Sequence, residues 1–499
     1  MENSLLLFLL WPFVTGLLLF LFPKKIPLLA QYSSLVFQIV WVLLFVWAIG
    51  PIWEELSVAG DGGGPRAFPV YFSWDWIPFL KSRFSLGLDG LNIPLLGLNV
   101  LLSLCLGFFS LNKKNLGPGY LGLFSILNGA SVGSLLAADA FVFYCFWEFM
   151  LIPMYLLIGG WGSKNRVYAS LKFFAFTMAG SLFMLAAILA LAFQFDVASL
   201  GWHDLVATNF EFQGWGSVQG LLFLGFMLAF VVKIPVWPFH TWLPDAHTEA
   251  PTGASVILAG VLLKLGVYGI ARWCLPLFPE ASAAAAPTLM ALGCVGIVMG
   301  AFAAWFQTDI KKMIAYSSVS HLGFMVLGLF ALGVEALQGA FFQNIAHGLS
   351  TGALFLIFGI IYERTHSREI SKYGGFAQEH AWLATSFILA SMASIGLPGL
   401  PGFVGEFLIL AGSFKTFPVY SLVALSGVLL GAIYMLGMLR RFAYGPVSEL
   451  VKSHPVRVTW NEWASLVPLL LFMIYLGFGS QAILSKVEPA ATQVLTYFR

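Results

Sequence analysis

Six titratable side chains lie inside long apolar stretches of this sequence, where a charge is costly. An ionisable residue at the centre of a membrane helix costs about 2.5–3.5 kcal/mol on insertion scales, so such residues are rare and usually functional. Carboxylates, amines and imidazoles in series are the groups from which proton and cation paths are built. The six that predict such a path are Glu148, Lys233, Lys264, His321, His347 and Glu406.

The residue types favour protons over metal cations as the transported species. Low dielectric favours the neutral form of a lysine, whereas a neighbouring carboxylate favours the charged form. A pair such as Glu148 and Lys233 is therefore expected to hold a proton and to release it when the carboxylate moves away or is protonated. Histidines can relay between such holders because imidazole titrates near neutral pH. A sodium site would instead favour carboxylates and backbone carbonyls, and the apolar stretches hold few carboxylates.

Each residue also has a structural interpretation. A lone buried histidine is usually a satisfied core residue, and a lysine near a helix end can extend to the interface. The second reading fits Lys264 poorly, since about a dozen mostly apolar residues flank it on both sides. Buried charges could also only lock helices together, as in a passive scaffold. Six such groups in one chain favour a path, with His240, just past Lys233, as an accessory group.

Apolar elements must position these residues, and the composition requires a membrane protein. Of 499 residues, 59% are hydrophobic and 10% are charged, with a mean hydropathy of +0.88. Soluble domains carry about 25% charged residues. This difference excludes a soluble enzyme, a disordered chain and a nucleic-acid-binding domain. The spacing of the four cysteines predicts no metal or iron–sulfur site, and the sequence has no glycine-rich phosphate loop that would predict a nucleotide site. His321 and His347 alone do not predict a haem site.

The fold class expected is an all-α polytopic membrane protein. A helix that crosses a bilayer needs about 20 apolar residues. The connection 51–87 is predicted to be an ordered loop. Fourteen segments meet the length requirement, at about 3–22, 28–50, 88–110, 119–137, 139–160, 167–195, 217–240, 250–275, 285–306, 313–333, 335–362, 381–412, 420–440 and 463–483.

The basic residues orient these spans, because Lys and Arg concentrate in cytoplasmic connections. Of the 25 basic residues, 16 fall in connections on one side, Lys311 among them. Seven fall on the other side, Arg272 among them, and the remaining two are Lys233 and Lys264. We expect the richer side to be cytoplasmic and both termini to lie outside.

Two spans carry proline interruptions beside a buried charge. Pro235 and Pro238 follow Lys233 in the seventh span, and they should free the carbonyls of Val231 and Ile234. In the twelfth span, Pro398 and Pro401 lie within GLPGLPG, just before Glu406. Each interruption alone could be an ordinary kink.

The interruptions lie five spans apart, and five is odd, so repeats of five spans must have opposite topologies. Inverted repeats with paired broken helices are typical of transporters. Lys233 and Glu406 would then occupy equivalent positions in the two repeats. The expected segments are a three-helix segment at 1–118, repeats at 119–275 and 285–441, and a C-terminal helix at 442–499.

Long motifs around these residues resemble those of a known family. They include WEFMLIPMYLLIGGWG, KIPVWPFHTWLPDAHTEAPTGASVILAGVLLKLGVYG, DIKKMIAYSSVSHLGFM, NIAHGLSTGALFL and SIGLPGLPGFVGEFLIL. The chain resembles the antiporter-like membrane subunits of respiratory complex I over nearly its whole length. Among them it is similar to the chain M (subunit 4) type, because it stops soon after its fourteenth span and has Glu406 where several relatives have lysine.

The resemblance implies a role for each residue. Glu148 matches the family's fifth-span glutamate, and Lys233 matches the lysine that pairs with it. Lys264 matches the central lysine of the eighth span. His321 and His347 match the bridging positions, and Glu406 matches the residue that exchanges protons on the outer side.

The resemblance also implies an assembly. Protons would be pumped here while quinone is reduced elsewhere, with NADH, FMN, iron–sulfur clusters and quinone bound by other subunits. Implied partners are the neighbouring antiporter-like subunits, the lateral helix of the chain L type, and lipids, in an energy-transducing membrane such as the bacterial inner membrane. A multisubunit cation/proton antiporter and a membrane-bound hydrogenase arm remain alternatives, because the former shares the same Glu and Lys motifs.

Overall fold

The computed structural model describes residues 2–56, 68–208 and 210–498. Within these ranges, 12 helices are long and apolar enough to cross a membrane. The predicted seventh and twelfth spans are not among them, because each is divided into shorter helices. The prediction of a helical membrane fold with two discontinuous spans is therefore confirmed, apart from a β-hairpin at 70–88, and the 12 continuous and two divided spans make fourteen.

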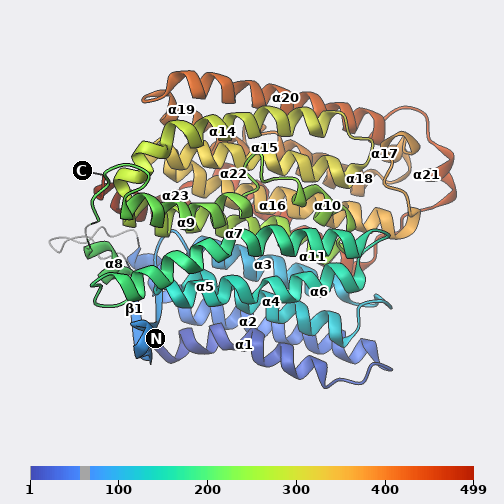
Figure 1. Cartoon of the computed structure of the whole chain (residues 1–499). Coiled ribbons are helices and arrows are strands. Elements are labelled where there is room, and N and C mark those ends of the chain that lie inside the picture. Colours follow the sequence, from blue (N-terminus) through green and yellow to red (C-terminus); the bar gives the residue numbers. More distant parts are fainter. Residues whose placement is uncertain (1, 57–67, 209, 499) are drawn as a thin grey trace.

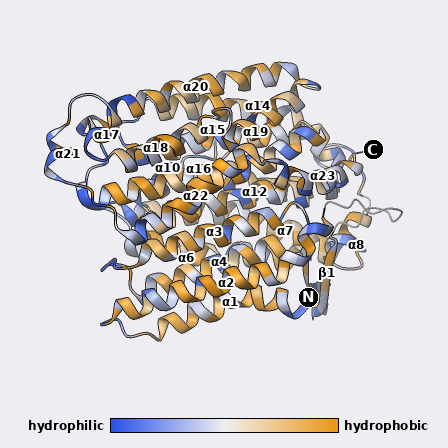
Figure 2. Ribbon diagram, turned by 180° about the vertical axis from the view of Figure 1, so that it is seen from behind, coloured by the Kyte–Doolittle hydropathy of each residue, from blue (hydrophilic) through white to orange (hydrophobic). Residues whose placement is uncertain are grey.

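The helices form a bundle with polar ends. Figure 1 places both chain termini, β1 (Val70–Ile77) and α8 (Trp202–Ala207) at one end of the bundle, and α17 (Phe376–Glu379) and α21 (Glu449–Ser453) at the opposite end. Apolar residues cover the helices along their length, and hydrophilic residues gather at the ends (Figure 2). The termini at one end agree with an even number of crossings.

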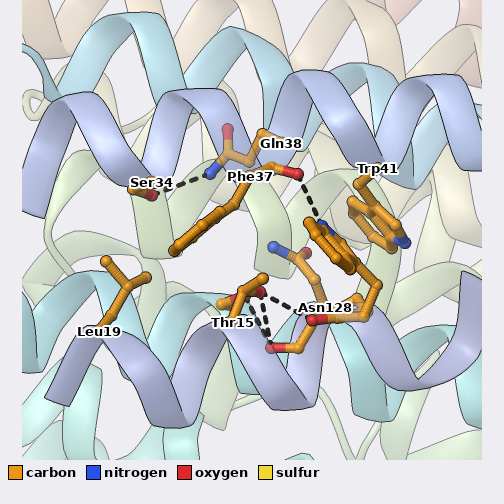
Figure 3. Close-up of a pocket in the computed structure, with 10 residues that line it drawn as sticks. Thr15, Leu19, Ser34, Phe37, Gln38, Trp41 and Asn128 are labelled. Carbon is orange, nitrogen blue, oxygen red and sulfur yellow. Dashed lines mark hydrogen bonds between the residues drawn. The ribbon is translucent and has the colours of Figure 1, made fainter. Parts of the chain in front are cut away.

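Polar contacts between α1, α2 and α4 hold the N-terminal segment together. Trp11 Nε1 donates to the Phe37 carbonyl oxygen at 2.8 Å, and Thr15 Oγ1 lies 3.0 Å from Ser125 Oγ. These groups line a small polar pocket between the helices (Figure 3). Side-chain hydrogen bonds of this kind join helices where the hydrophobic effect is weak. The elements of this segment are α1 (Glu2–Phe20), α2 (Pro27–Glu55), β1 (Val70–Ile77), η1 (Pro78–Leu80), β2 (Ser82–Leu88) and α3 (Ile93–Ser110).

The prediction of a loop at 51–87 was wrong in part. Strands β1 and β2 form an antiparallel hairpin over 70–88, while residues 57–67 lie outside the described ranges. The alternation of aromatic and polar residues in VYFSWDWI is typical of a strand, and it does not show in the mean hydropathy of the segment. Asp139 ties the hairpin to α5, because its carboxylate accepts from Ser82 Oγ and from the Arg83 backbone N–H.

The seventh span ends at Lys233 because Pro235 and Pro238 interrupt the hydrogen-bond ladder. The Val231 carbonyl is freed as expected, and the Val232 carbonyl, which was not expected to take part, also has a partner outside the helix. The Val231 carbonyl accepts from the Val236 N–H at 2.9 Å, and the Val232 carbonyl accepts from Trp242 Nε1 at 3.0 Å. The helices of spans four to seven are α4 (Pro118–Leu136), α5 (Ala140–Phe149), α6 (Leu151–Trp161), α7 (Arg166–Gln194), α8 (Trp202–Ala207), α9 (Val218–Lys233) and α10 (Trp242–Glu249).

The eighth span contains two π-helical turns, which the sequence did not predict. They lie on either side of the α-helical turns that carry Lys264. Such turns occur mostly as local bulges and frequently at functional sites. The span runs through α11 (Thr252–Ile257), η2 (Leu258–Leu262), α12 (Leu263–Gly269), η3 (Ile270–Cys274) and α13 (Leu275–Leu277).

The twelfth span stops at Ser394 and resumes at Pro401. Gly396 has a φ of +77°, which lets the Leu397 N–H return to the Met392 carbonyl at 3.1 Å and close the helix end. The helices of spans nine to thirteen and their connections are α14 (Pro279–Trp305), α15 (Ile310–Phe330), α16 (Val334–Thr365), η4 (Ile370–Lys372), α17 (Phe376–Glu379), α18 (Ala381–Ser394), α19 (Pro401–Phe414) and α20 (Pro418–Ala443).

The region 442–499 holds more than the single helix expected. Its helices are α21 (Glu449–Ser453), α22 (Trp460–Phe478) and α23 (Gln481–Thr496). Of these, α22 corresponds to the fourteenth span. The five-span repeats themselves remain a prediction.

The innermost helices carry the candidate residues. The eighth span, α15 and α16 are buried almost throughout, whereas α2, α7, α20 and α22 expose much of their surface. Lys264, His321 and His347 lie on the buried helices.

Two basic residues counted among the connections lie inside the bundle. Arg272 belongs to η3, and Lys311 belongs to the first turn of α15; both are buried. Assigning them to loops was therefore wrong.

Candidate functional site

Lys264 and His347 contact each other in the centre of the bundle. The Lys264 ammonium hydrogen-bonds His347 Nδ1, which joins α12 to α16. Both side chains are almost fully buried. His347 Nε2 has no hydrogen-bond partner among the described residues, so this ring nitrogen remains available for a second contact.

The second histidine continues the series toward the interrupted twelfth span. The His321 and His347 ring centroids lie 5.3 Å apart. On its other side, His321 Nδ1 lies 2.7 Å from Glu406 Oε1. The structure thus places Lys264, His347, His321 and Glu406 in consecutive contact, each on a different helix. No hydrogen bond joins the two histidines within the described residues, so a row of groups that accept and donate protons is complete here except for the step between the two rings.

Gln343 and glycine residues position the Glu406 carboxylate. Gln343 Nε2 donates to Glu406 Oε1 at 3.0 Å, so this oxygen receives two hydrogen bonds. A Cβ on Gly405 would lie 2.4 Å from Gln343 Oε1, so glycine allows α19 to approach α16 here. A Cβ on Gly396 would meet Glu406 Oε2 at 3.4 Å, which places the helix interruption beside the carboxylate.

Glu148 and Lys233 form no direct ion pair. The Lys233 ammonium has no hydrogen-bond partner among the described side chains and lies 4.9 Å from the centroid of the Trp147 ring. Glu148 Oε1 also lacks a partner, and the nearby Ser181 hydroxyl donates to the Met178 carbonyl oxygen. The two charges interact electrostatically across a gap. From the sequence we expect these two residues to approach within ion-pair or single-water distance; the structure shows no direct contact, and separation by a single water stays a prediction.

His240 stands apart from the other six candidates. It is half-buried in the segment between α9 and α10, close enough to Lys172 to interact electrostatically. Within the described ranges, His240 makes no hydrogen bond or ring contact with any of the six. The four prolines lie at the two interruptions, as predicted.

The sequence analysis missed His247 and the burial of Lys311. His247 is fully buried, stacks on Phe355 with ring centroids 4.8 Å apart, and interacts electrostatically with Lys264 and Lys311. The Lys311 ammonium donates to the Ala250 carbonyl oxygen at 2.8 Å. Both residues lie near the ends of predicted apolar segments, in PDAHTEAP and DIKKM, where a titratable residue reads as part of a loop.

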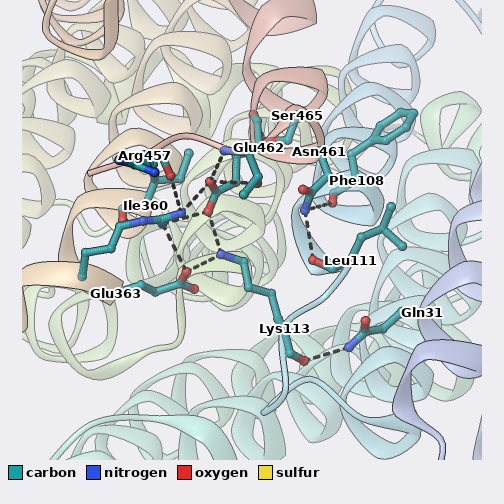
Figure 4. A network of polar contacts seen from close by, with 12 residues as sticks. Gln31, Phe108, Leu111, Lys113, Ile360, Glu363, Arg457, Asn461, Glu462 and Ser465 are labelled. Atoms are coloured by element: carbon teal, nitrogen blue, oxygen red, sulfur yellow. Dashed lines mark hydrogen bonds and ion pairs between the residues drawn. The ribbon is translucent and has the colours of Figure 1, made fainter. Parts of the chain in front are cut away.

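A cavity of about 500 Å³ opens beside Lys311. Its wall includes Tyr120, Trp161 and Lys113. Lys113 also belongs to an ion-pair network that joins the α3–α4 connection to α16 and α22 (Figure 4). In this network, Glu462 accepts from Lys113 Nζ at 2.8 Å and from both terminal nitrogens of Arg364 at 2.8 Å.

A second buried ion pair lies at the opposite end of the eighth span. Arg272 hydrogen-bonds Asp89, and its guanidinium group lies 4.4 Å from the centroid of the Phe68 ring. Trp202 Nε1 donates to the Arg272 carbonyl oxygen at 2.8 Å. These contacts anchor the hairpin region to the span that carries Lys264.

Among the residues that the structure describes, no three His, Cys, Asp or Glu side chains gather as metal ligands. The expectation that this chain binds no metal or cofactor stays a prediction.

Comparisons with known proteins agree on one family. Residues 137–433 match the family model described as NADH:quinone oxidoreductase/Mrp antiporter, TM. The NADH-quinone oxidoreductase subunit M of Pseudomonas aeruginosa is 41% identical over 490 residues, covering 95% of this chain and 94% of that protein.

Solved structures show the same fold. A chain of respiratory complex I from Thermus thermophilus is 31% identical with a TM-score of 0.84, covering 99% of this chain and 100% of that chain. A chain of the Mrp complex from Dietzia sp. DQ12-45-1b is 20% identical with a TM-score of 0.83, covering 99% and 98%. At that identity, the second likeness supports the fold alone.

Proposed function

Because this chain belongs to the family described as NADH:quinone oxidoreductase/Mrp antiporter, TM, we propose that it is a proton-translocating membrane-arm subunit of an NADH:quinone oxidoreductase. The relative named subunit M matches it over nearly the full length of both chains. The observation that carries the proposal is the row of contacts from Lys264 through His347 and His321 to Glu406.

Protons pass along this row, with Glu406 as the exit group. Lys264 gives a proton to His347 Nδ1, and His347 gives one from Nε2 toward His321. His321 then gives its Nδ1 proton to Glu406 Oε1, which lies within hydrogen-bond distance. Glu406 finally releases the proton to the outer side through the interrupted twelfth span, where irregular backbone is tolerated if it lines a wet cavity.

Protons enter from the side with the richer basic connections. The cavity beside Lys311 opens there, and His247 interacts electrostatically with both Lys311 and Lys264. These two residues extend the row toward the cytoplasmic side. Water bridges the remaining gaps, since ordered water is nearly as good a hydrogen-bond partner as a side chain.

Glu148 and Lys233 control the release of a proton toward the row of residues that begins at Lys264. Protonation or movement of Glu148 removes the electrostatic support of the Lys233 ammonium, which then releases its proton. The gap between the groups suits a switch, because a direct buried pair would bind the proton more firmly. His240 is an accessory group at the seventh-span interruption.

Redox chemistry belongs to other subunits of the assembly. We propose that they bind NADH, FMN, iron–sulfur clusters and quinone, and that this chain only moves protons as part of the translocase. Its partners are the neighbouring antiporter-like subunits, a lateral helix of the chain L type and lipids. Its location is a bacterial inner membrane, with both termini outside.

The alternative is a subunit of a multisubunit cation/proton antiporter or of a membrane-bound hydrogenase. The antiporter receives less support, because the Mrp chain is 20% identical whereas the subunit M relative is 41% identical. Identification of the subunits in the purified native complex separates the three. Redox subunits with NADH:quinone activity support the proposal, and a complex without them contradicts it.

Replacement of Glu406 tests the path directly. Glu406→Gln keeps the shape of the side chain and removes its ability to carry the proton. Proton uptake into vesicles, normalised to assembled complex, should fall to a small fraction of the wild-type rate, and coupled quinone reduction should slow with it. The matched control is Glu335→Gln, since Glu335 makes an exposed ion pair with Lys415 and contacts none of the path residues. Normal uptake by the Glu406→Gln complex would overturn the proposal.

A further inference from the structure

Ser394 contacts the nitrogen of His321 that faces away from Glu406. Its Oγ lies 3.3 Å from His321 Nε2, and both side chains are buried. Ser394 is the last residue of α18, and Glu406 lies in α19, so the two halves of the interrupted twelfth span contact opposite nitrogens of one imidazole.

Only an interrupted helix allows this arrangement. In a continuous helix, residues 394 and 406 would lie about 18 Å apart along the axis, at 1.5 Å per residue. The two nitrogens of an imidazole are separated by a small fraction of that length. The interruption with Gly396 at φ +77° folds the chain back, so that the hydroxyl and the carboxylate meet the same ring.

We propose that Ser394 is a positioning residue for the relay: its hydroxyl supports both tautomers of His321, so that the ring can accept a proton at one nitrogen while releasing one from the other. This inference rests on the proposed function, because it concerns a step of the same proton path.

The chemistry of the step requires such a partner. Before the step, neutral His321 carries its proton on Nδ1 and donates it to the Glu406 carboxylate, while Nε2 accepts from the Ser394 hydroxyl. The Ser394 hydroxyl then turns its hydrogen away from Nε2, a proton arrives at Nε2 from the side of His347, and the Nδ1 proton moves to Glu406 Oε1. The ring gains one proton and loses one, so it stays neutral, and Nε2–H now donates to Ser394 Oγ.

A hydroxyl group suits this exchange because it can both donate and accept, and its hydrogen rotates freely. An alanine at this position would leave a buried ring nitrogen without its hydrogen-bond partner in either tautomer. A buried polar group without a partner is destabilised, and a hydrogen bond of this kind changes an equilibrium by about threefold to tenfold. We expect the rate of coupled proton transfer to fall by about the same factor.

The experiment compares Ser394→Ala, Ser394→Thr and Ser391→Ala in the whole complex. Ser391 is the matched control, because it is fully buried on the same helix and its hydroxyl donates to the Phe387 carbonyl oxygen within its own helix. The measurements are proton uptake into vesicles per assembled complex and the solvent isotope effect (H₂O against D₂O) on coupled quinone reduction.

The Ser394→Ala complex should pump several-fold more slowly and show a larger isotope effect, because the step at His321 becomes limiting. Ser394→Thr should restore both values, and Ser391→Ala should leave both unchanged. A purely structural role would not move the isotope effect. Wild-type behaviour of Ser394→Ala, or failure of threonine to rescue it, would overturn the inference.

The Glu406→Gln complex keeps this test separate from that of the proposed function. If Glu406→Gln stops pumping while Ser394→Ala pumps normally with an unchanged isotope effect, only the role of Ser394 is refuted. If Glu406→Gln pumps normally, the proton path itself is refuted, and the role of Ser394 is refuted with it.

Discussion

His321 Nδ1 lies 2.7 Å from Glu406 Oε1, and this contact joins α15 to the second half of the interrupted twelfth span. A hydrogen bond with an ionised partner is roughly twice as strong as a neutral one, so the contact holds the carboxylate at the end of the row. The residues that aim Glu406 at His321 should therefore influence proton transfer without carrying the proton themselves.

Gln343→Leu should slow pumping and leave assembly intact. The substitution removes the 3.0 Å hydrogen bond to Glu406 Oε1, and hydrogen bonds to charged groups contribute about 1.5–3 kcal/mol. Proton uptake per assembled complex should fall by roughly tenfold or more. The control is Gln338→Leu on the same helix, since within the described ranges Gln338 makes no hydrogen bond to Glu406. Equal rates for the two variants would show that Gln343 does not position the carboxylate.

Gly405→Ala should destabilise the packing of α19 on α16. The new Cβ would lie 2.4 Å from Gln343 Oε1 and 2.8 Å from Gln343 Cα, so the helices must separate. Overpacking of this kind costs about 1–3 kcal/mol. Thermal stability and yield of the assembled complex should both fall. Gly437→Ala in α20 is the control, because a Cβ there meets nothing within 4 Å; similar losses in both variants would count against close packing as the cause.

Arg272→Met should destabilise the C-terminal end of the eighth span. Removal of one partner leaves Asp89 charged and buried, and such a change costs about 3–5 kcal/mol. The double variant Arg272→Met with Asp89→Asn removes both charges and should recover part of the loss. The measurement is the temperature at which the purified complex dissociates. A double variant as unstable as the single one would mean that the arginine acts through packing against Phe68 rather than through its charge.

The elements that carry the site were predictable because membrane spans are encoded locally. An apolar run specifies a span by length alone, and the prolines beside Lys233 and before Glu406 specify where two spans stop. The contacts could not be predicted in the same way. Lys264 and His347 lie 83 positions apart, and only the packing of α12 on α16 brings them together.

The errors arose where a span border and a polar residue coincide. His247, Lys311 and Arg272 are titratable residues at the ends of apolar runs, and such residues usually mark connections. Here they are buried, because neighbouring helices and the hairpin cover those ends. The aromatic strands at 70–88 were not predicted, because the mean hydropathy of a segment does not detect an alternation of apolar and polar residues.

The absence of a direct contact between Glu148 and Lys233 leaves the Trp147 ring as a close neighbour of the Lys233 ammonium, 4.9 Å away. Lys233 and Trp147 are both almost fully buried. An ammonium over an aromatic face gains about 0.5–2 kcal/mol, with the larger values at desolvated sites, and Trp is the strongest partner. The indole ring therefore favours the protonated state of Lys233 whatever the state of Glu148.

Trp147→Leu should for this reason shift Lys233 toward its neutral form and lower pumping by roughly threefold to thirtyfold, the factor that corresponds to that interaction. Trp147→Phe keeps an aromatic face and should lie between Leu and the wild type. The control is Phe143→Leu, since Phe143 is equally buried on the same helix and its ring packs on Trp147 at 5.4 Å without contacting the ammonium. Proton uptake per assembled complex decides the matter. If Trp147→Leu and Phe143→Leu pump equally well, then the indole ring does not determine the charge of Lys233.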